Sequence, residues 1–247
     1  MALSPVWYSC YQAAEAQKKS FNFDMAFPEK FDLLRLYDIE YKMRNTSEDE
    51  EFHRLMKAFI TIHDAYLNYE PLPIEHAPTR MYTSDPRLEI KDIHQKFHGF
   101  FKTLDGYKIL TEEGYQLIQQ FNLGQGTQFF PIRLYHYETN QPINNETYYL
   151  MCLTDWRNYL LPEFCEGELY DFSTTKGGVI SNWLTPGDEF NDAIALSSEA
   201  SNCDLDLWHD PALHGSLFMS DRLKQALEQV GFLPCWHVLS TVLIYKQ

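Results

Sequence analysis

The chain has 247 residues, of which 45% are hydrophobic and 15% aromatic, a composition typical of a folded globular protein and not of a disordered one. Its 35 acidic and 20 basic residues give a formal net charge of −15, which argues against a nucleic-acid-binding function because phosphates must be neutralised by lysine and arginine. Five cysteines without a C-x-x-C pair, and a start without signal-peptide features, predict a cytoplasmic protein with reduced thiols.

The N-terminal part contains one well-marked helix. Ser47 and Glu50 form a capping box, and apolar residues then recur with helical spacing. This pattern predicts an amphipathic helix over about residues 47–69, which Pro71 ends. His63 falls on the apolar stripe of this helix, where a core histidine with a polar partner is expected.

A second, shorter helix is predicted over residues 90–101. It carries His94 and His98 at i, i+4 spacing, so the two imidazoles could meet one metal ion. No third ligand of a known spacing stands beside them, and the chain has no His-Glu-x-x-His pattern. The sequence therefore predicts neither a metal site nor another cofactor.

Two segments repeat one pattern of strand, N-cap and amphipathic helix. In the later segment, an apolar strand ends at the N-cap Ser220, and the helix ends at Gly231. Residues 104–123 match residues 213–232 without a gap when Thr111 is aligned with Ser220. Either the chain contains an internal duplication, or two independent units share their caps and spacing. The apolar stripe of the later helix consists of Leu223, Ala226, Leu227 and Val230.

Further strands are predicted around the two segments. Residues 129–137 form a strand with Pro131 near its start, which favours an edge position or a bulge, and residues 147–154 form the returning hairpin arm. Residues 232–239 are apolar and predict a strand after the later helix. The sequence thus predicts an α+β fold with mixed sheets, two similar strand–helix–strand units and an N-terminal amphipathic helix. We expect an N-terminal region over residues 1–95, within the same domain or beside it, and an α+β domain over residues 96–247.

Negative charge is concentrated between Leu160 and Asp210, where 11 acidic residues stand against Lys176 as the one basic residue. A solvated acidic surface is the ordinary interpretation of such a run. The alternative is a surface that attracts a basic partner and accelerates its association. The candidate partner-binding residues are Glu163, Glu166, Glu168, Asp171, Asp188, Glu189 and Asp192.

No catalytic pattern stands out in the sequence. The chain has no Gly-x-Ser-x-Gly elbow and no cysteine in a recognisable catalytic setting. A hydrolase would have to use His209 or His214 with the carboxylates near them. The sequence therefore predicts that the protein is not an enzyme.

The succession of these blocks resembles a known family. The chain resembles the eleventh immunity-protein family of bacterial polymorphic toxin systems, formerly a domain of unknown function. The similarity lies in the blocks at residues 108–118, 129–134 and 148–153. It is strongest in the last block, Leu217-Phe-Met-Ser with the following Leu-Lys, Ala-Leu and Gly231. The likeness covers about residues 100–239. One departure is Pro234, which stands where the family often has glycine.

The resemblance implies a cytoplasmic inhibitor, encoded beside a toxin, that binds and neutralises this toxin in the producing cell or its siblings. Many such toxins are nucleases with basic clefts, which an acidic inhibitor would complement. We therefore expect an immunity protein whose partner is a basic toxin, with no nucleic acid and no membrane as partner. Two alternatives remain: a hydrolase that uses His209 or His214, and an adaptor or scaffold of a secretion system.

Overall fold

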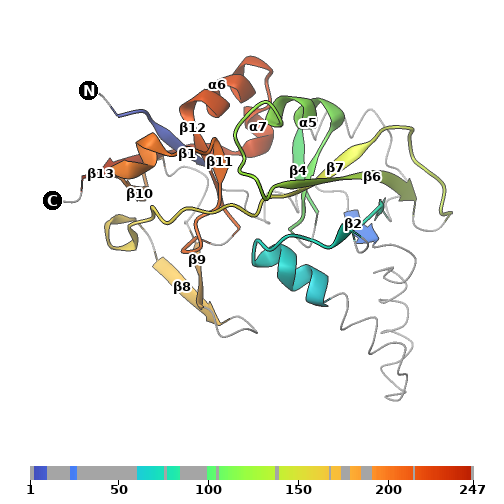
Figure 1. The fold of residues 1–247 in the computed structure, drawn as a ribbon, viewed down its shortest axis with the longest axis horizontal. Helices are drawn as coiled ribbons and strands as arrows, with labels where there is room; N and C mark the ends of the chain where they lie inside the picture. Colours follow the sequence, from blue (N-terminus) through green and yellow to red (C-terminus); the bar gives the residue numbers. More distant parts are fainter. Residues whose placement is uncertain are drawn as a thin grey trace. The chain divides into compact units, whose positions relative to one another are not determined.

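Figure 1 shows the fold in a computed structural model of the chain. The chain has an α+β fold with two mixed sheets, as the sequence predicted. Within the residues that the structure describes, no helix is long and apolar enough to cross a membrane. These residues are 3–9, 23–26, 60–74, 77–83, 99–103, 106–136, 139–166, 168–173, 179–184, 191–213 and 215–245, with the backbone alone described at 23–26, 168–173 and 179–184.

The chain forms two compact units, each assembled from segments that are distant in sequence. Unit 1 comprises Met1–Gln12, Gln116–Gly126 and Leu153–Gln247. Unit 2 comprises Ala13–Tyr115 and Thr127–Cys152. The boundary expected near residue 95 differs from this division, because unit 1 takes its first strand from the N-terminus of the chain.

Unit 2 is built on a six-stranded sheet in the order β2-β3-β6-β7-β5-β4. β3 and β6 are parallel, and the other neighbouring strands are antiparallel. Helix α5 (Glu112–Ile118) follows β5, and the boundary between the two units runs through it. The strands are β2 (Phe23–Ala26), β3 (Arg80–Thr83), β4 (Phe100–Lys102), β5 (Lys108–Leu110), β6 (Gln128–His136) and β7 (Tyr148–Cys152).

The predicted hairpin is confirmed, since β6 and β7 pair antiparallel over Gln128–Ile132 and Tyr148–Cys152. β6 is an interior strand, but its pairing with β3 begins only at Arg133. Pro131 therefore lies where β6 has β7 as its neighbour but not yet β3, and its missing N–H costs no hydrogen bond to β3.

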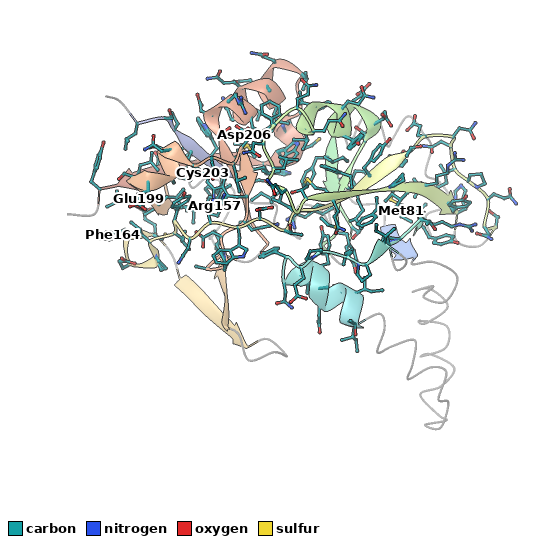
Figure 2. All side chains as sticks on the ribbon, in the orientation of Figure 1. Met81, Arg157, Phe164, Glu199, Cys203 and Asp206 are labelled. Carbon is teal, nitrogen blue, oxygen red and sulfur yellow. The ribbon has the colours of Figure 1, made fainter. Side chains whose placement is uncertain are left out.

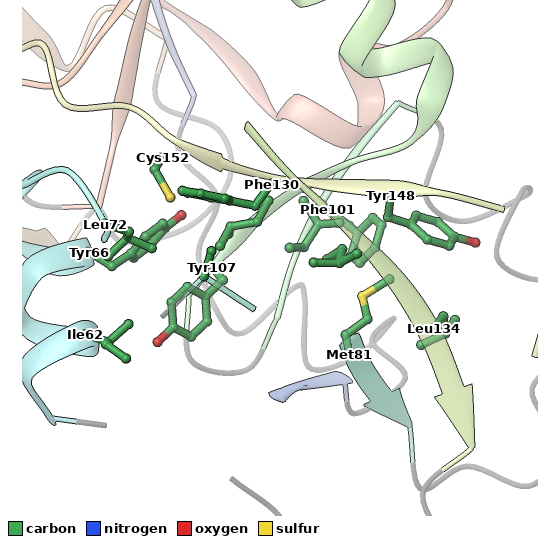
Figure 3. Close-up of a cluster of buried hydrophobic side chains, with 14 residues drawn as sticks. Ile62, Tyr66, Leu72, Met81, Phe101, Tyr107, Phe130, Leu134, Tyr148 and Cys152 are labelled. Carbon is green, nitrogen blue, oxygen red and sulfur yellow. The ribbon is translucent and has the colours of Figure 1, made fainter. Parts of the chain in front are cut away.

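The core of unit 2 packs a helical segment against the sheet (Figure 3). Residues 60–67 are helical, residues 68–69 of the predicted helix 47–69 form a turn instead, and residues 47–59 lie outside the described residues. Ile62 and Tyr66 contribute to a buried cluster with strand residues such as Leu150. His63 Nδ1 lies 3.1 Å from Tyr107 Oη, so this histidine has the polar partner expected of it.

Unit 1 is built on a five-stranded sheet in the order β10-β13-β1-β12-β11, beside a separate hairpin of β8 and β9. β10 and β13 are parallel, and the other neighbouring strands of the larger sheet are antiparallel. The strands are β1 (Val6–Ser9), β8 (Glu168–Ser173), β9 (Val179–Leu184), β10 (Ile194–Ser197), β11 (Leu207–Trp208), β12 (Leu217–Ser220) and β13 (Val238–Ile244). The helices are α6 (Asp221–Gln229), α7 (Leu233–Trp236) and the 3₁₀ turns η2 (Pro162–Phe164) and η3 (Ser198–Asn202).

Both ends of α6 agree with the sequence. The Ser220 hydroxyl accepts a hydrogen bond from the Leu223 N–H at 3.2 Å. At the other end Gly231 has φ 77°, and the N–H groups of Gly231 and Phe232 donate to the carbonyls of Glu228 and Leu227. This is the Schellman arrangement, which requires a left-handed residue that glycine adopts without strain.

Two details of this block were predicted wrongly. Val230 is 49% exposed and does not extend the buried stripe of Leu223 and Leu227, because the helix has already ended one residue before it. The predicted strand 232–239 is instead the short helix α7 followed by β13. Pro234 lies in the first turn of α7, where its missing N–H is not needed. Apolar character alone therefore does not distinguish this short helix from a strand.

The two sheets share one topology over five strands. From the edge hairpin inward, unit 2 has β4-β5-β7-β6-β3, and unit 1 has β11-β12-β1-β13-β10. In each unit a helix connects the second strand of this series to the fourth, and the fifth strand is parallel to the fourth. The third strand differs in origin, because β7 follows β6 along the chain whereas β1 comes from the N-terminus (Figure 1, blue).

The equivalent positions also share local geometry. Gly106 and Gly215, which precede the second strand, have φ values of 82° and 80°. The Thr111 hydroxyl accepts from the Gly114 N–H at 3.2 Å, as Ser220 does from its own helix.

A second shared feature joins the third strand to the helix. Tyr149 Oη donates to Glu112 Oε2 at 2.7 Å in unit 2, and Trp7 Nε1 donates to Asp221 Oδ1 at 3.0 Å in unit 1. In both units an aromatic residue of the third strand thus binds the first acidic residue of the helix. These features favour an internal duplication over two unrelated capped helices.

Candidate partner-binding surface

Residues 156–166, which we name the strap, begin beside His209, where the Arg157 N–H donates to the His209 carbonyl at 2.9 Å, and continue along the β10 edge of the unit 1 sheet. The Leu161 N–H donates to the Ala195 carbonyl of β10 at 2.9 Å, and the Ser197 N–H donates back to the Tyr159 carbonyl at 2.8 Å. Further along, the Glu166 N–H donates to the Ala193 carbonyl at 2.8 Å. The strap therefore covers β10, which would otherwise present an unpaired edge.

The side chain of Asp210 holds the backbone of the strap by hydrogen bonds. One oxygen of this buried carboxylate accepts from the N–H groups of Tyr159 and Leu160 at 2.8 Å each, and the other accepts from the Ala212 N–H at 3.0 Å. Burial raises the pKa of Asp210 above its ordinary value, although these three hydrogen bonds act in the opposite direction. Asp210 is fully buried, so its role is to hold the backbone of the strap and not to contact a ligand.

The outer side of the strap carries two large apolar side chains. Trp156 is 53% exposed and Phe164 is 55% exposed, while Leu160 and Leu161 between them are buried in the unit 1 core. Figure 2 labels Phe164 on this segment. Exposed aromatic side chains on a hydrogen-bonded backbone are typical of the anchor residues of protein–protein interfaces.

Several exposed carboxylates lie on the strap and next to β10. Glu163 and Glu166 are exposed on the strap itself, and Asp192 is exposed next to Ala193, to which the strap is hydrogen-bonded. Glu199, which is labelled in Figure 2, is exposed on η3 directly after β10. The strap and its neighbourhood thus combine apolar anchors with an acidic rim.

The described basic side chains of unit 1 do not neutralise this rim, because each is paired elsewhere. Arg157 binds Asp204 with an N···O distance of 2.7 Å. Lys224 binds Glu228 at 2.7 Å within α6. The third, Arg222, binds the carboxylate of Asp206.

Asp206 forms the most extensive polar network described in unit 1. Its carboxylate accepts from the Ser220 hydroxyl at 2.6 Å, from the Asn122 N–H at 2.9 Å and from the Arg222 guanidinium. Burial acts to raise the pKa of Asp206, but these hydrogen bonds together outweigh it and hold the pKa below its ordinary value. The network fixes the segment around Asn122 to the start of α6, and we assign it a structural role.

The predicted partner-binding residues fall into three groups. The structure places Glu163, Glu166 and Asp192 together on or beside the strap, and all three are exposed. Glu168 and Asp171 lie in β8, whose backbone alone is described, and Asp188 and Glu189 lie outside the described residues. Binding by these residues stays a prediction.

Trp156 and Phe164 were not among the predicted site residues. The available signal was the presence of three aromatic side chains, those of Trp156, Tyr159 and Phe164, in a proline-containing acidic segment without helical or strand periodicity. Because the segment has no periodicity, its aromatic residues cannot be assigned to a core-facing side of a helix or strand, and they are therefore candidates for exposure.

The residues weighed for other chemistry are placed as follows. His209 is 1% exposed, and its Nδ1 lies 3.0 Å from the Ser216 carbonyl oxygen, so a substrate could not reach the imidazole without a rearrangement. His214, His94 and His98 lie outside the described residues. Within the described part of the chain, no cluster of three or more His, Cys, Asp or Glu side chains is arranged to hold a metal ion.

Cys152, Cys165 and Cys203 are free thiols. Compared with known proteins, the chain matches no model of a protein family and no curated protein.

Proposed function

We propose that the protein is an immunity protein that binds a basic toxin through the strap and thereby neutralises it. The observation that carries this proposal is that the strap exposes Trp156 and Phe164 together with the carboxylates of Glu163 and Glu166. Asp210 holds the backbone of this segment at Tyr159 and Leu160. The resemblance of residues 100–239 to an immunity-protein family supports the same function.

The two kinds of residue would contribute differently to binding. Exposed carboxylates attract a basic partner over several ångströms and mainly increase the association rate, an effect that salt screens. Aromatic anchors lose water only in the final complex, so their removal mainly increases the dissociation rate. This division allows the charge and the apolar part of the surface to be tested separately.

The first experiment is co-expression with the toxic product of the neighbouring gene. The wild-type chain should restore growth and co-purify with the toxin as a stoichiometric complex. Growth inhibition that persists despite soluble, folded chain, together with no complex in solution, would refute the immunity function.

The second experiment locates the surface by association kinetics. The triple variant E163Q/E166Q/D192N should lower the association rate constant about tenfold at low salt and flatten its salt dependence. The single variants W156A and F164A should each weaken binding by about 1–4 kcal/mol through faster dissociation.

A matched control carries equal charge changes elsewhere. The variant E70Q/E113Q/E228Q removes three exposed carboxylates outside the strap and should leave the association rate near that of the wild type. If this control and the rim variant slow association equally, net charge and not the strap determines the encounter. Immunity with unchanged kinetics in every strap variant would place the interface on another surface.

The adaptor alternative makes a different prediction. An adaptor of a secretion system would co-purify with secretion components in the absence of the toxin and would give no protection on its own. The hydrolase alternative would require His209 to become accessible, since it is 1% exposed in this structure.

A further inference from the structure

β13 is an interior strand of the unit 1 sheet, since it pairs with β10 on one side and with β1 on the other (Figure 1). None of its seven residues is buried, and Val242 is 37% exposed. The corresponding strand of unit 2, β6, buries Phe130, Ile132 and Leu134 in its core. An interior strand of mainly apolar residues is thus left partly open to solvent in unit 1.

The two sides of β13 differ, because side chains alternate between the faces of a strand. Leu239 and Leu243 pack against the buried core cluster of unit 1. On the opposite side Trp7 of β1 is the cross-strand neighbour of β13, and Lys224 Nζ of α6 lies 4.9 Å from the centroid of its ring. Helix α6 therefore covers this side of the sheet as far as β1. The residues of β13 beside it, which we name the β13 face, are Val238, Ser240, Val242 and Ile244.

The fold does not require apolar side chains on the β13 face. Ser240 and Pro131 are each the cross-strand partner of the third-strand aromatic residue that binds the helix, so Val242 corresponds to Arg133 of β6. Arg133 is exposed, as expected for a charged side chain on a solvated surface. Unit 1 instead has valine at this position, with Ile244 next to it on the same face. Neighbouring exposed apolar residues are typical of an interaction surface.

The β13 face is joined to the strap. Asp192, one of the rim carboxylates, accepts from the Ser240 hydroxyl at 2.7 Å. Ala195 of β10 is the cross-strand partner of Val242, and its N–H donates to Cys165 Sγ of the strap at 3.2 Å. Strand β10 alone thus separates the β13 face from the strap. A standard interface covers about 800 Å² on each partner, which is large enough to include both.

We propose that the β13 face is a second, apolar part of the toxin interface, which extends from the strap across β10. This inference rests on the proposed immunity function and adds the chemistry of the toxin surface. The toxin would pack apolar side chains on Val242 and Ile244 and pair a cation with Asp192 at the edge of the face. A second copy of this chain fits less well, because each copy has a net charge of −15 and would bring like charge to the same rim.

The decisive variant is V242R in the full chain, because arginine is the residue that unit 2 has at the equivalent position. The fold should therefore tolerate it, whereas the complex would have to bury an added arginine against a basic toxin. With the toxin encoded by the neighbouring gene, we expect V242R to accelerate dissociation about tenfold to a hundredfold in surface plasmon resonance.

V230R is the matched control, since it adds the same charge. Val230 is 49% exposed directly after α6 and does not belong to the β13 face. This variant should leave the dissociation rate within about twofold of the wild type. Hydroxyl-radical labelling of the wild-type chain tests the surface without a substitution. Labelling of Val242 and Ile244 should fall in the complex, while labelling of Val230 should not.

The outcomes separate this inference from the proposed function. A wild-type chain that forms no complex with the toxin would refute the immunity function and, with it, the occupant proposed for the β13 face. A complex that dissociates at the same rate with V242R and V230R, and leaves the labelling of Val242 unchanged, would overturn only the inference about β13. A change in the oligomeric state of V242R without a change in toxin binding would also overturn it, because the occupant would then be a second copy.

Discussion

Unit 2 completes its sheet with β7, which follows β6 directly, whereas unit 1 fills the same place with β1 from the opposite end of the chain. The positions that agree between the units, such as the Thr111 and Ser220 caps, are those that the shared fold requires. Other equivalent positions carry different side chains in the two units. Unit 2 has a buried lysine, Lys108, where unit 1 has Leu217.

The two units also differ at the residue whose backbone carbonyl accepts a hydrogen bond from the helix cap, which is Gly99 in unit 2 and Asp206 in unit 1. Both carbonyls accept from the cap residue of the following helix, Thr111 at 3.2 Å and Ser220 at 3.0 Å. In unit 2 the helix packs directly on this backbone, because a Cβ on Gly114 would lie 2.0 Å from the Gly99 oxygen. Unit 1 instead uses the Asp206 side chain to bind other segments, which shows that this corner of the fold tolerates either close packing or a polar network.

The largest effect is expected from moving β1. Deleting residues 1–12 removes the middle strand of the unit 1 sheet and should abolish cooperative folding of this unit, measured by loss of amide-exchange protection in β12 and β13. Transferring the same residues to the C-terminus through a short linker should restore protection, since β13 and β1 are antiparallel neighbours like β6 and β7. A transferred strand that fails to restore protection would argue against the common topology.

The next largest effect on the free energy of unfolding is expected when the residues at the equivalent positions Lys108 and Leu217 are exchanged. L217K places an unpaired charge in the unit 1 core and should cost about 3–5 kcal/mol at pH 7 in urea unfolding. K108L should instead stabilise the protein at pH 6, by on the order of a few kcal/mol. A stabilising L217K would show that the two positions are not equivalent.

The pH dependence of K108L follows from the pKa. The folded pKa of Lys108, about 7, lies below its ordinary value of 10.5, so the unfolded chain binds more protons between these pH values. The gain from K108L is therefore full below pH 7 and disappears as the pH rises toward 10.5. A gain that stays constant across this range would have another cause, such as better packing.

A smaller effect is expected at Asp206. D206N should cost about 1–3 kcal/mol at pH 7, because the charge-assisted hydrogen bonds from Arg222 and Ser220 are weakened in a buried site. The folded pKa is lowered, so this loss is fully present above the ordinary aspartate pKa and vanishes as the pH falls through the folded value.

The control for this prediction is D204N, which breaks the ion pair with Arg157. Asp204 has a side chain that is 68% exposed, and exposed ion pairs contribute little to stability. Urea unfolding should therefore show a change below about 0.5 kcal/mol. Equal losses in D204N and D206N would mean that burial does not distinguish the two arginine–aspartate pairs.

The smallest effects are expected where the third strand binds the helix. Y149F and W7F each remove one hydrogen bond to an acidic residue, Glu112 or Asp221, and should each cost about 0.5–1.5 kcal/mol in thermal or urea unfolding. In the wild type, hydrogen bonding to Glu112, with burial, raises the pKa of Tyr149 to about 12, so its hydroxyl remains a hydrogen-bond donor at neutral pH. A loss confined to one variant would show that the shared contact matters in one unit only.

The sequence by itself determined the local elements. Caps such as Ser220 and the terminating Gly231 fix helix ends through hydrogen bonds and backbone geometry within a few residues, so α6 and the similarity of its earlier counterpart could be predicted. The fold class, the β6–β7 hairpin and the exposed carboxylates of the strap followed from the same local information.

Only the tertiary structure decided which segments meet. The pairing of β1 with β12 and β13 joins the two ends of the chain, and no local preference encodes such a contact. The exposure of Trp156, and the burial of Lys108 where the related unit has leucine, depend in the same way on neighbours distant in sequence. The physical reason is that burial is a property of the assembled core, whereas caps and turns are properties of the nearby backbone.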